Sequence, residues 1–317
     1  LWPGDILHIY ALCALALFPF RKLSVRWLIP LGLLLATVQV VVPAFEYVSR
    51  TELQQTHTVA VEKQAKGQKL TAKETEAIKE WQEKVDRING KEPEVEKLTK
   101  DEVKARSGSF MDYAGFLIST YILIVGKGSL LGGIAEAFTV MLLGIAAWKL
   151  GFIQGQRSTR DYWIALIVAY GFGLTARYVG GLERMTFQPI PKTIWMTSEL
   201  ARIAVSVGHV ALINLLMRGV IGRKIMWPFL AAGQMAFTLY LMQQVIGVHI
   251  LYSPAGLHWP MAPGWAWLAG LASVVVVFQL ILANLWMRWF ASGPLEWLWR
   301  SLAYCKKQPF RRLPAAD

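Results

Sequence analysis

Two ionisable residues near the start of the chain have the types and the spacing needed for acid–base chemistry. Asp5 and His8 are three residues apart, so they share one face of a helix. A carboxylate in this position can orient an imidazole, and the imidazole can then take a proton from a nucleophile. We therefore predict that His8 is a catalytic base and that Asp5 is its partner. A structural interpretation also stays open, in which Asp5 caps a helix start and His8 lies at a membrane interface.

Further ionisable side chains interrupt long apolar runs. A charged side chain in hydrocarbon costs about 2.5 kcal/mol or more, so it should face a bundle interior or an aqueous cavity. The resulting candidates for substrate binding are Glu46, Glu136, Arg177, Glu199, Arg202 and His209. Glu199 and Arg202 again lie three residues apart, and they could form part of such a site or a purely structural ion pair.

Uncharged polar side chains form a lane along another apolar run. These further candidates for substrate binding are Gln234, Thr238, Tyr240, Gln243 and Gln244. Gln234 and Thr238 lie on one stripe of a helix, and Tyr240 and Gln244 lie on another. Such side chains can line a substrate passage, or they can tie neighbouring helices together. Both interpretations stay open for this lane.

The sequence has no pattern typical of metal, phosphate or redox chemistry. Cys13 and Cys305 are too few and too far apart for a thiolate metal site or a disulfide framework. His249 and His258 lack metal-ligand spacing, and no phosphate-binding glycine motif is present. We therefore predict that the chain has no metal site.

The elements that must position these residues are membrane-spanning helices. Of the 317 residues, 55% are hydrophobic and 14 are Trp, which is more than a soluble domain needs. A run of about 20 apolar residues crosses the roughly 30 Å hydrocarbon layer of a bilayer. We predict an all-α, polytopic transmembrane bundle of about seven spans, at residues 5–20, 27–48, 130–151, 162–181, 195–217, 226–252 and 265–290.

The distribution of charge indicates the orientation of these spans. The formal charge is +12, but the Lys and Arg residues lie mainly in short links, which indicates membrane orientation and not nucleic-acid binding. The apolar stretch 113–125 is short for a span, so we predict an interfacial or re-entrant helix over 113–126. The basic links and the C-terminus then face the cytoplasm, and the uncharged link 253–264 faces outside. The charged candidates fall in the outer parts of their spans, with His209 nearer the middle, which predicts a cavity open to that side.

The same topology places the polar segment 49–112 outside the cytoplasm. Thr71 and Glu74 have capping-box spacing at one helix start, and Thr99 and Glu102 predict a second. The segment is either a solvated helical hairpin or a module that binds a protein partner. The predicted organisation is two spans in 1–48, a polar helical insert in 49–112, the interfacial or re-entrant helix in 113–126, five spans in 127–299 and a basic cytoplasmic tail in 300–317.

Five strings of residues occur in an order typical of one known family. The chain opens on Trp2-Pro3-Gly4-Asp5-Ile6-Leu7-His8-Ile9-Tyr10 and continues with Ser107-Gly108-Ser109-Phe110 and Met141-Leu142-Leu143-Gly144. Gly233-Gln234-Met235-Ala236-Phe237-Thr238-Leu239-Tyr240-Leu241-Met242-Gln243 is followed by Gly293-Pro294-Leu295-Glu296-Trp297-Leu298-Trp299-Arg300. These strings resemble the YeiB-like bacterial inner-membrane proteins, which are largely of unknown function. The family usually has Arg, Asn and Ser where this chain has Gln234, Leu239 and Gln244.

The resemblance implies a multi-pass protein of the bacterial inner membrane. It also implies a distant similarity to membrane acyltransferases, which pass an acyl group from a cytoplasmic coenzyme A thioester to an acceptor across the membrane. On this hypothesis the donor is acyl-CoA, the pantetheine enters along the polar lane, and the acceptor is a small molecule or an envelope component.

The alternative hypothesis is a transporter or accessory subunit that binds an amphiphile or, at residues 49–112, a protein partner. The family's upstream L-D-x-x-R-G and F-G-x-G strings are absent, so we expect that the chain begins partway through a longer protein.

Overall fold

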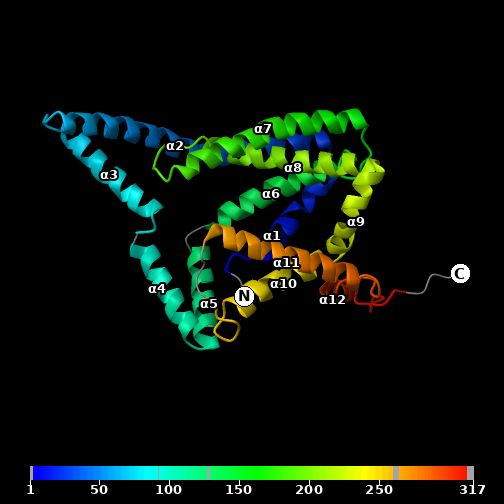
Figure 1. The fold of residues 1–317 in the computed structure, drawn as a ribbon. Helices are drawn as coiled ribbons and strands as arrows, with labels where there is room; N and C mark the ends of the chain where they lie inside the picture. The colour runs from blue at the N-terminus through cyan, green and yellow to red at the C-terminus, as the bar shows by residue number, and fades with distance from the viewer. Residues whose placement is uncertain (1–2, 92, 127–128, 260–263, 313–317) are drawn as a thin grey trace. The chain divides into compact units, whose positions relative to one another are not determined.

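The computed structural model describes residues 3–91, 93–126, 129–259 and 264–312, and these residues are mainly α-helical (Figure 1). The predicted all-α class is therefore confirmed. In the described residues, the only bridge of β type joins Phe290 to Arg311. Parts of several predictions lie outside the described residues, namely Trp2 of the opening string, residue 92 of the insert, 127–128 of the five-span segment, 260–263 of the uncharged link and 313–317 of the tail.

The chain forms two compact units. The larger unit combines Asp5–Lys100 with Leu123–Leu215, and the smaller unit combines Leu1–Gly4, Asp101–Ile122 and Leu216–Asp317. In chain order the helices are α1 (Leu7–Leu17), the 3₁₀ turn η1 (Pro19–Lys22), α2 (Val25–Ala65), α3 (Ala72–Ile88), α4 (Pro93–Ser107), α5 (Phe110–Gly126), α6 (Ser129–Lys149), α7 (Thr159–Met185), α8 (Ile194–Arg218), α9 (Val220–Gln234), α10 (Ala236–Gln244), the π-helix η2 (Val245–Leu251), α11 (Trp265–Trp286) and α12 (Pro294–Ala303).

Five helices in the described part of the chain are long and apolar enough to cross a membrane, and these are α2, α6, α7, α8 and α11. Helix α9 and the segment Ala236–Leu251 would form a sixth span, bent by 73°. The chain is therefore a polytopic membrane protein, with five or six full-length spans where we predicted about seven. Helix α5, which contains the predicted interfacial stretch, has 17 residues, and its relation to the membrane stays a prediction.

The predicted span 5–20 accounts for part of this difference. Its helix, α1, has 11 residues, so it extends for only about 16 Å. Pro19 follows closely and begins the 3₁₀ turn η1. Proline suits the first position of this new turn, because the N–H group that it lacks would have no partner there.

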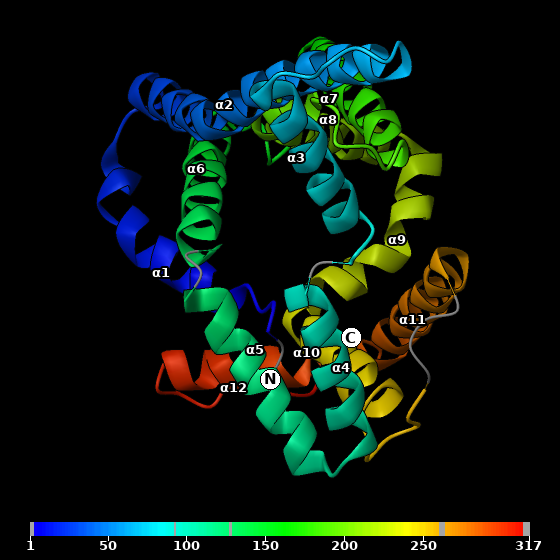
Figure 2. The ribbon, with the colours of Figure 1, turned by 90° about the vertical axis from the view of Figure 1, so that its left-hand side faces the viewer.

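Helix α6 packs against both α1 and α2 in the larger unit (Figure 2). Leu17 of α1, Leu28 of α2 and Leu142 of α6 form a buried apolar cluster. Gly32 of α2 allows a close approach to α6, because a Cβ at this position would lie 2.5 Å from Leu143 Cδ2. These contacts fix α1 against α6.

Helices α7 and α8 lie side by side through small residues (Figure 1). Gly208 of α8 packs under the ring of Tyr170, where a Cβ would lie 2.2 Å from Tyr170 Cδ1. Gly173 of α7 meets Val205 in the same way, with 2.8 Å between the position of its Cβ and Val205 Cγ2. In a lipid environment such close backbone packing holds helices together, since lipid tails are as apolar as the side chains.

Helix α2 continues beyond its predicted membrane end at Val48 and pairs with α3 to form a helical hairpin (Figure 1). The predicted capping box is confirmed, because the Glu74 N–H donates to Thr71 Oγ1 at 3.3 Å and the Thr71 N–H donates to Glu74 Oε2 at 2.8 Å. Glu74 Oε1 also accepts a hydrogen bond from Lys63 Nζ of α2 at 2.6 Å. The same carboxylate therefore caps α3 and joins the two arms of the hairpin.

The second predicted helix start, at Thr99, is wrong. Thr99 lies inside α4, and its hydroxyl donates to the backbone carbonyl of Val95 at 2.9 Å. The helix begins instead at Pro93, a residue that suits the first helical position because its missing N–H would have no partner there.

A buried carboxylate closes the break between α9 and α10 in the smaller unit. Met235 has φ −118° and ψ 20°, so the first N–H groups of α10 have no acceptor in a preceding helical turn. Glu296 of α12 supplies one, because its Oε1 accepts from the N–H groups of Phe237 at 2.7 Å and Thr238 at 3.0 Å. Its Oε2 accepts from the Thr238 hydroxyl at 2.5 Å.

Gly293 leaves the space that this carboxylate occupies. A Cβ at Gly293 would lie 2.1 Å from Glu296 Oε2, and the Glu296 residue itself is only 5% exposed. The two C-terminal strings singled out in the sequence therefore meet at one hydrogen-bonded junction, which gives a physical reason for their occurring together.

The Lys63–Glu74 contact predicts an acid-sensitive hairpin. The hydrogen bond from Lys63, followed by the one from the Thr71 backbone, lowers the pKa of Glu74 from 4.5 to about 2. A carboxyl whose pKa is lowered by folding stabilises the hairpin above its unfolded pKa, and this contribution is lost as the pH falls from 4.5 towards 2. Hydrogen–deuterium exchange, corrected for intrinsic rates, should show α3 losing protection over that range. Glu74→Gln should lower protection at neutral pH and flatten the pH profile.

The matched control for this experiment is Glu76→Gln, which removes an exposed carboxylate from the same helix. It should keep the wild-type profile. Identical profiles for wild type and Glu74→Gln would contradict the role given to Glu74.

Removing the Glu296 carboxylate should destabilise the smaller unit. Glu296→Ala leaves two backbone N–H groups and one hydroxyl without their acceptor, at a cost of about 2–4 kcal/mol in the free energy of unfolding. Gly293→Ala should act in the same direction, because the added Cβ displaces the carboxylate. Thermal unfolding of the detergent-solubilised protein measures both effects, with Glu76→Gln as the control. An unchanged Tm for Glu296→Ala would show that the junction does not stabilise the fold.

Candidate functional site

A cavity of about 450 Å³ lies in the larger unit between α1, α6 and α8. Its lining residues are Ile6, Ile9, Tyr10, Gly133, Glu136, Ala137, Val140, Met141 and Arg202. The wall is mainly apolar and contains three polar side chains, those of Tyr10, Glu136 and Arg202. Ligand sites commonly combine an apolar wall with a few polar groups that orient the ligand, and this cavity has that composition.

Arg202 joins two carboxylates at the cavity. Its guanidinium forms ion pairs with Glu136 of α6 and with Glu199, one turn earlier in α8, so the predicted Glu199–Arg202 pair is present. Arg177 of α7 is exposed and lies within electrostatic reach of Glu199. The side chains of Arg202 and Glu199 are 22% and 19% exposed, whereas that of Glu136 is 49% exposed. Glu136 is therefore the carboxylate that a ligand could reach.

The Asp5–His8 pair lies at the start of α1, the helix that forms one wall of the cavity. His8 Nδ1 and Asp5 Oδ2 are 3.5 Å apart, and the two side chains are 31% and 30% exposed. Because Nδ1 faces the carboxylate, Nε2 is the nitrogen that would accept a proton from a nucleophile. His8 directly precedes Ile9 and Tyr10, which line the cavity, although neither Asp5 nor His8 is itself a lining residue.

The remaining charged candidates do not line the cavity. Glu46 forms an ion pair with Arg50, four residues later in α2. His209 Nδ1 contacts a backbone carbonyl oxygen of its own helix at 2.6 Å, and its ring packs edge-on against Tyr170. The structure thus brings Glu136, Glu199 and Arg202 together and leaves Glu46 and His209 apart from them.

The predicted polar lane is interrupted by the bend between α9 and α10. Gln234 is the last residue of α9, and the helix axis turns by 73° beyond it, so the stripe predicted to contain both Gln234 and Thr238 is wrong. The cause is the non-helical backbone of Met235. Tyr240 is partly buried within α10, and Gln244 is the last residue of that helix.

Two residues of the lane make contacts that join helices. Thr238 is 8% exposed and donates to Glu296 of α12. Gln243 Nε2 donates to Gln279 Oε1 of α11 at 2.7 Å, and Gln279 Nε2 donates to the carbonyl oxygen of Leu239 at 2.8 Å. These contacts agree with the interpretation that polar side chains tie helices together, and a substrate passage stays a prediction.

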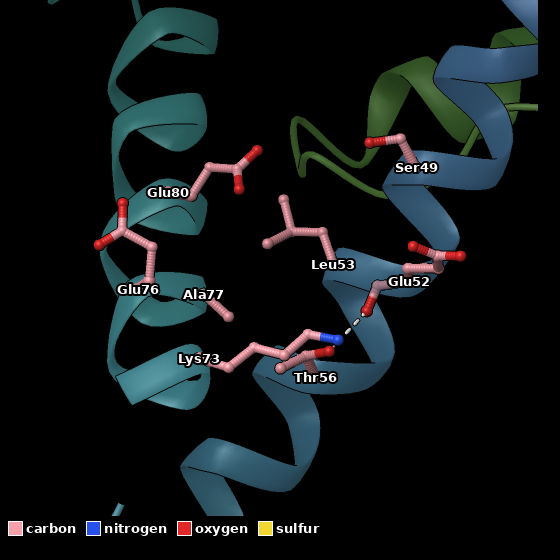
Figure 3. Close-up of a pocket in the computed structure, with 8 residues that line it drawn as sticks. All are labelled: Ser49, Glu52, Leu53, Thr56, Lys73, Glu76, Ala77 and Glu80. Carbon is pink, nitrogen blue, oxygen red and sulfur yellow. Dashed lines mark hydrogen bonds between the residues drawn. The ribbon is translucent and has the colours of Figure 1, made fainter. Parts of the chain in front are cut away.

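A second pocket, of about 270 Å³, lies between the arms of the hairpin (Figure 3). Its lining residues are Ser49, Glu52, Leu53 and Thr56 of α2 and Lys73, Glu76, Ala77 and Glu80 of α3. Leu53 and Ala77 are buried where the arms meet, and the charged side chains surround them. Over the residues that the structure describes, no three His, Cys, Asp or Glu side chains are arranged to hold a metal ion. The pocket has the composition of a solvated seam between two helices.

Sequence reasoning missed Tyr10 and the pairing of Glu136 with Arg202. The available signal for Tyr10 was its place in the opening string, one helical turn after Ile6, which also lines the cavity. The Glu136–Arg202 pair joins residues on α6 and α8 that are distant in the sequence, so no local spacing could indicate it.

Residues 147–306 match the family described as "Protein of unknown function (DUF418)". "Uncharacterized protein YeiB" of Escherichia coli (strain K12) is 26% identical over 169 residues, which is 51% of this chain and 43% of that protein. "Uncharacterized protein YxaH" of Bacillus subtilis (strain 168) is 40% identical over 91 residues, which is 28% of this chain and 22% of that protein. An "Uncharacterized 39.9 kDa protein in amylase 3'region" of Bacillus acidopullulyticus is 31% identical over 103 residues, which is 32% of this chain and 29% of that protein.

The chain thus covers less than half the length of each of these curated relatives. No solved structure gives a significant match. The family match covers half of the chain, and the similarity to YeiB agrees with the resemblance seen in the sequence strings. The chain therefore belongs to DUF418, a YeiB-like family of proteins of unknown function.

Proposed function

We propose that this protein is a transmembrane acyltransferase that moves an acyl group from cytoplasmic acyl-CoA to an acceptor in the cavity between α1, α6 and α8. The proposal rests on one observation. The Asp5–His8 pair stands at the start of the helix that lines a cavity containing the Arg202 ion pairs. A proton acceptor beside a cavity with fixed charges is what acyl transfer to a hydroxyl or an amine requires.

In the proposed reaction the acceptor binds with its polar groups on Glu136 and Tyr10. His8, oriented by Asp5, takes a proton from the acceptor hydroxyl or amine as that group attacks the carbonyl carbon of the thioester. The new ester or amide bond forms while the carbon–sulfur bond breaks, and the departing thiolate takes up a proton. Arg202 acts as a positioning residue, because it holds the Glu136 carboxylate in place.

Basic residues at the other end of α1 suit a donor that carries phosphate groups. The cavity involves the first residues of α1, whereas Arg21 and Lys22 follow its last residues. Lys149, at the end of α6, lies there too, with its Nζ 2.6 Å from the carbonyl oxygen of Leu23. Because α6 has spanning length, with Glu136 in its first half and Lys149 at its end, donor and acceptor would approach from opposite membrane faces. The same basic residues also agree with the predicted membrane orientation.

The proposed location is a bacterial inner membrane. By the positive-inside rule the basic links and the C-terminal tail face the cytoplasm, and the cavity and the α2–α3 hairpin face outside. Thr238 and Gln243 already bind Glu296 and Gln279, so we do not assign the pantetheine to the polar lane.

Radiolabelled acetyl-CoA, supplied to the cytoplasmic face of vesicles that contain the full-length protein, should lose its acetyl group to an acceptor. His8→Ala should lower this rate by about 10²–10⁴-fold, the usual contribution of a general base. Asp5→Asn should lower it less, because the imidazole keeps its position in the helix. The control is His258→Asn, which replaces an exposed histidine outside the larger unit by a residue that tolerates its positive φ of 47°.

Two results would count against acyl transfer. The wild-type protein could fail to bind or turn over the thioester, or His8→Ala could keep the wild-type rate. If deletion of the α2–α3 hairpin abolishes a cellular phenotype that His8→Ala and Asp5→Asn leave intact, the binding-protein alternative is favoured.

A further inference from the structure

The connection between α7 and α8 (residues 186–193) is associated with one buried and one partly buried cation. Lys192 is 9% exposed, and its Nζ donates to the carbonyl oxygen of Gln188 at 3.0 Å. Arg50 of α2 has a side chain that is 13% exposed, and its Nη1 donates to the neighbouring carbonyl oxygen, that of Pro189, at 3.3 Å. Two positive charges are therefore held on adjacent carbonyl groups of one short segment.

The charges around Lys192 do not cancel. Arg50 forms an ion pair with Glu46, while Arg184 and Glu183, at the end of α7, lie within electrostatic reach of Lys192. Within the described ranges no carboxylate oxygen lies within 4.0 Å of Lys192 Nζ. Three cations and two carboxylates leave a net charge of +1. Burial first, then Arg50 and Arg184, lower the pKa of Lys192 from 10.5, with Glu183 opposing them, as expected for a cation without a close counter-ion.

Exposed apolar side chains flank these cations. Met185 is 73% exposed and Phe187 is 63% exposed. Phe187 has φ +50°, a left-handed conformation that residues other than glycine rarely adopt and that occurs mainly where the surroundings require it. The Arg50 guanidinium also lies over the ring of Trp195, 5.4 Å from its centroid. Since α7 and α8 both have spanning length, their connection lies at a membrane–water interface, where Trp is enriched.

We propose that this connection binds the phosphodiester group of a membrane glycerophospholipid. The single negative charge of a phosphodiester matches the net charge of +1, and Arg and Lys are the usual ligands of phosphate oxygens. Met185 and Phe187 then contact the acyl chains of the same lipid. A purely structural role for Lys192 and Arg50, as partners of two carbonyl groups of the connection, would require neither the exposed phenyl ring nor the unbalanced charge.

The test uses delipidated full-length protein in detergent, titrated with phosphatidylglycerol. Native mass spectrometry counts bound lipid, and the rise in Tm with lipid concentration gives the affinity for the lipid.

Wild type should retain phosphatidylglycerol, and Lys192→Gln and Arg184→Gln should each weaken its binding by about tenfold, the effect of losing one interaction with a charged group. Arg184 is exposed, so Arg184→Gln remains informative even if Lys192→Gln does not fold. Phe187→Gly should weaken binding while relieving the backbone conformation. The control, Lys79→Gln, removes an exposed hairpin lysine.

Two further ligands separate the parts of the lipid. Diacylglycerol has the acyl chains without the phosphate, and glycerophosphoglycerol has the phosphodiester without the acyl chains. Both should bind much more weakly than phosphatidylglycerol. Equal binding of diacylglycerol would show an ordinary hydrocarbon contact, and equal binding of glycerophosphoglycerol would show a site for a soluble anion. Either result, or unchanged phosphatidylglycerol binding in Arg184→Gln and Phe187→Gly, would overturn the proposal. The measurement does not involve acyl transfer, so its outcome is independent of the proposed reaction.

Discussion

A charged side chain that leaves water must find its counter-charge within the protein, and the cavity of the larger unit is built around that requirement. Arg202 meets it by pairing with Glu136 on α6 and with Glu199 on its own helix. Apolar side chains gain little by leaving lipid for one another, so ion pairs and close glycine contacts have a large share in deciding which helices associate. The Glu136–Arg202 pair therefore holds α6 against α8 and also provides the cavity with two of its three polar side chains.

Backbone N–H and carbonyl groups outside regular helical turns likewise need hydrogen-bond partners. The break at Met235 exposes N–H groups at the start of α10, and the negative carboxylate of Glu296 accepts from them. The carbonyl groups of Gln188 and Pro189, just after α7, instead accept from Lys192 and Arg50. At Met235 a buried charge thus completes the hydrogen bonding of an interrupted helix, and after α7 two cations satisfy carbonyl groups of the connection. Charged residues in this protein thus satisfy backbone groups as well as one another.

Local patterns predicted those features that depend on neighbours in the sequence. The lengths of the apolar runs indicated most spans, and the Thr71–Glu74 spacing located the start of α3, because a capping box is completed within one helical turn. The i,i+3 spacing likewise predicted the Glu199–Arg202 pair. The break at Met235 could not be predicted in this way, since its hydrogen-bond acceptor is on α12, far along the chain. The Glu136–Arg202 contact escaped prediction for the same reason.

The length of α2 has a mechanical consequence. Its 41 residues form a rod about 60 Å long, which packs against α6 near one end and against α3 in the hairpin near the other. Pro30 and Pro43 are its weakest points, because each removes one hydrogen bond between successive turns. The stretch beyond Pro43 contains no proline and is therefore stiffer than the stretch that contains the two prolines. A force on the tip of the α2–α3 hairpin would therefore bend α2 mainly at Pro30 and Pro43, and α2 packs against α6, which lines the cavity.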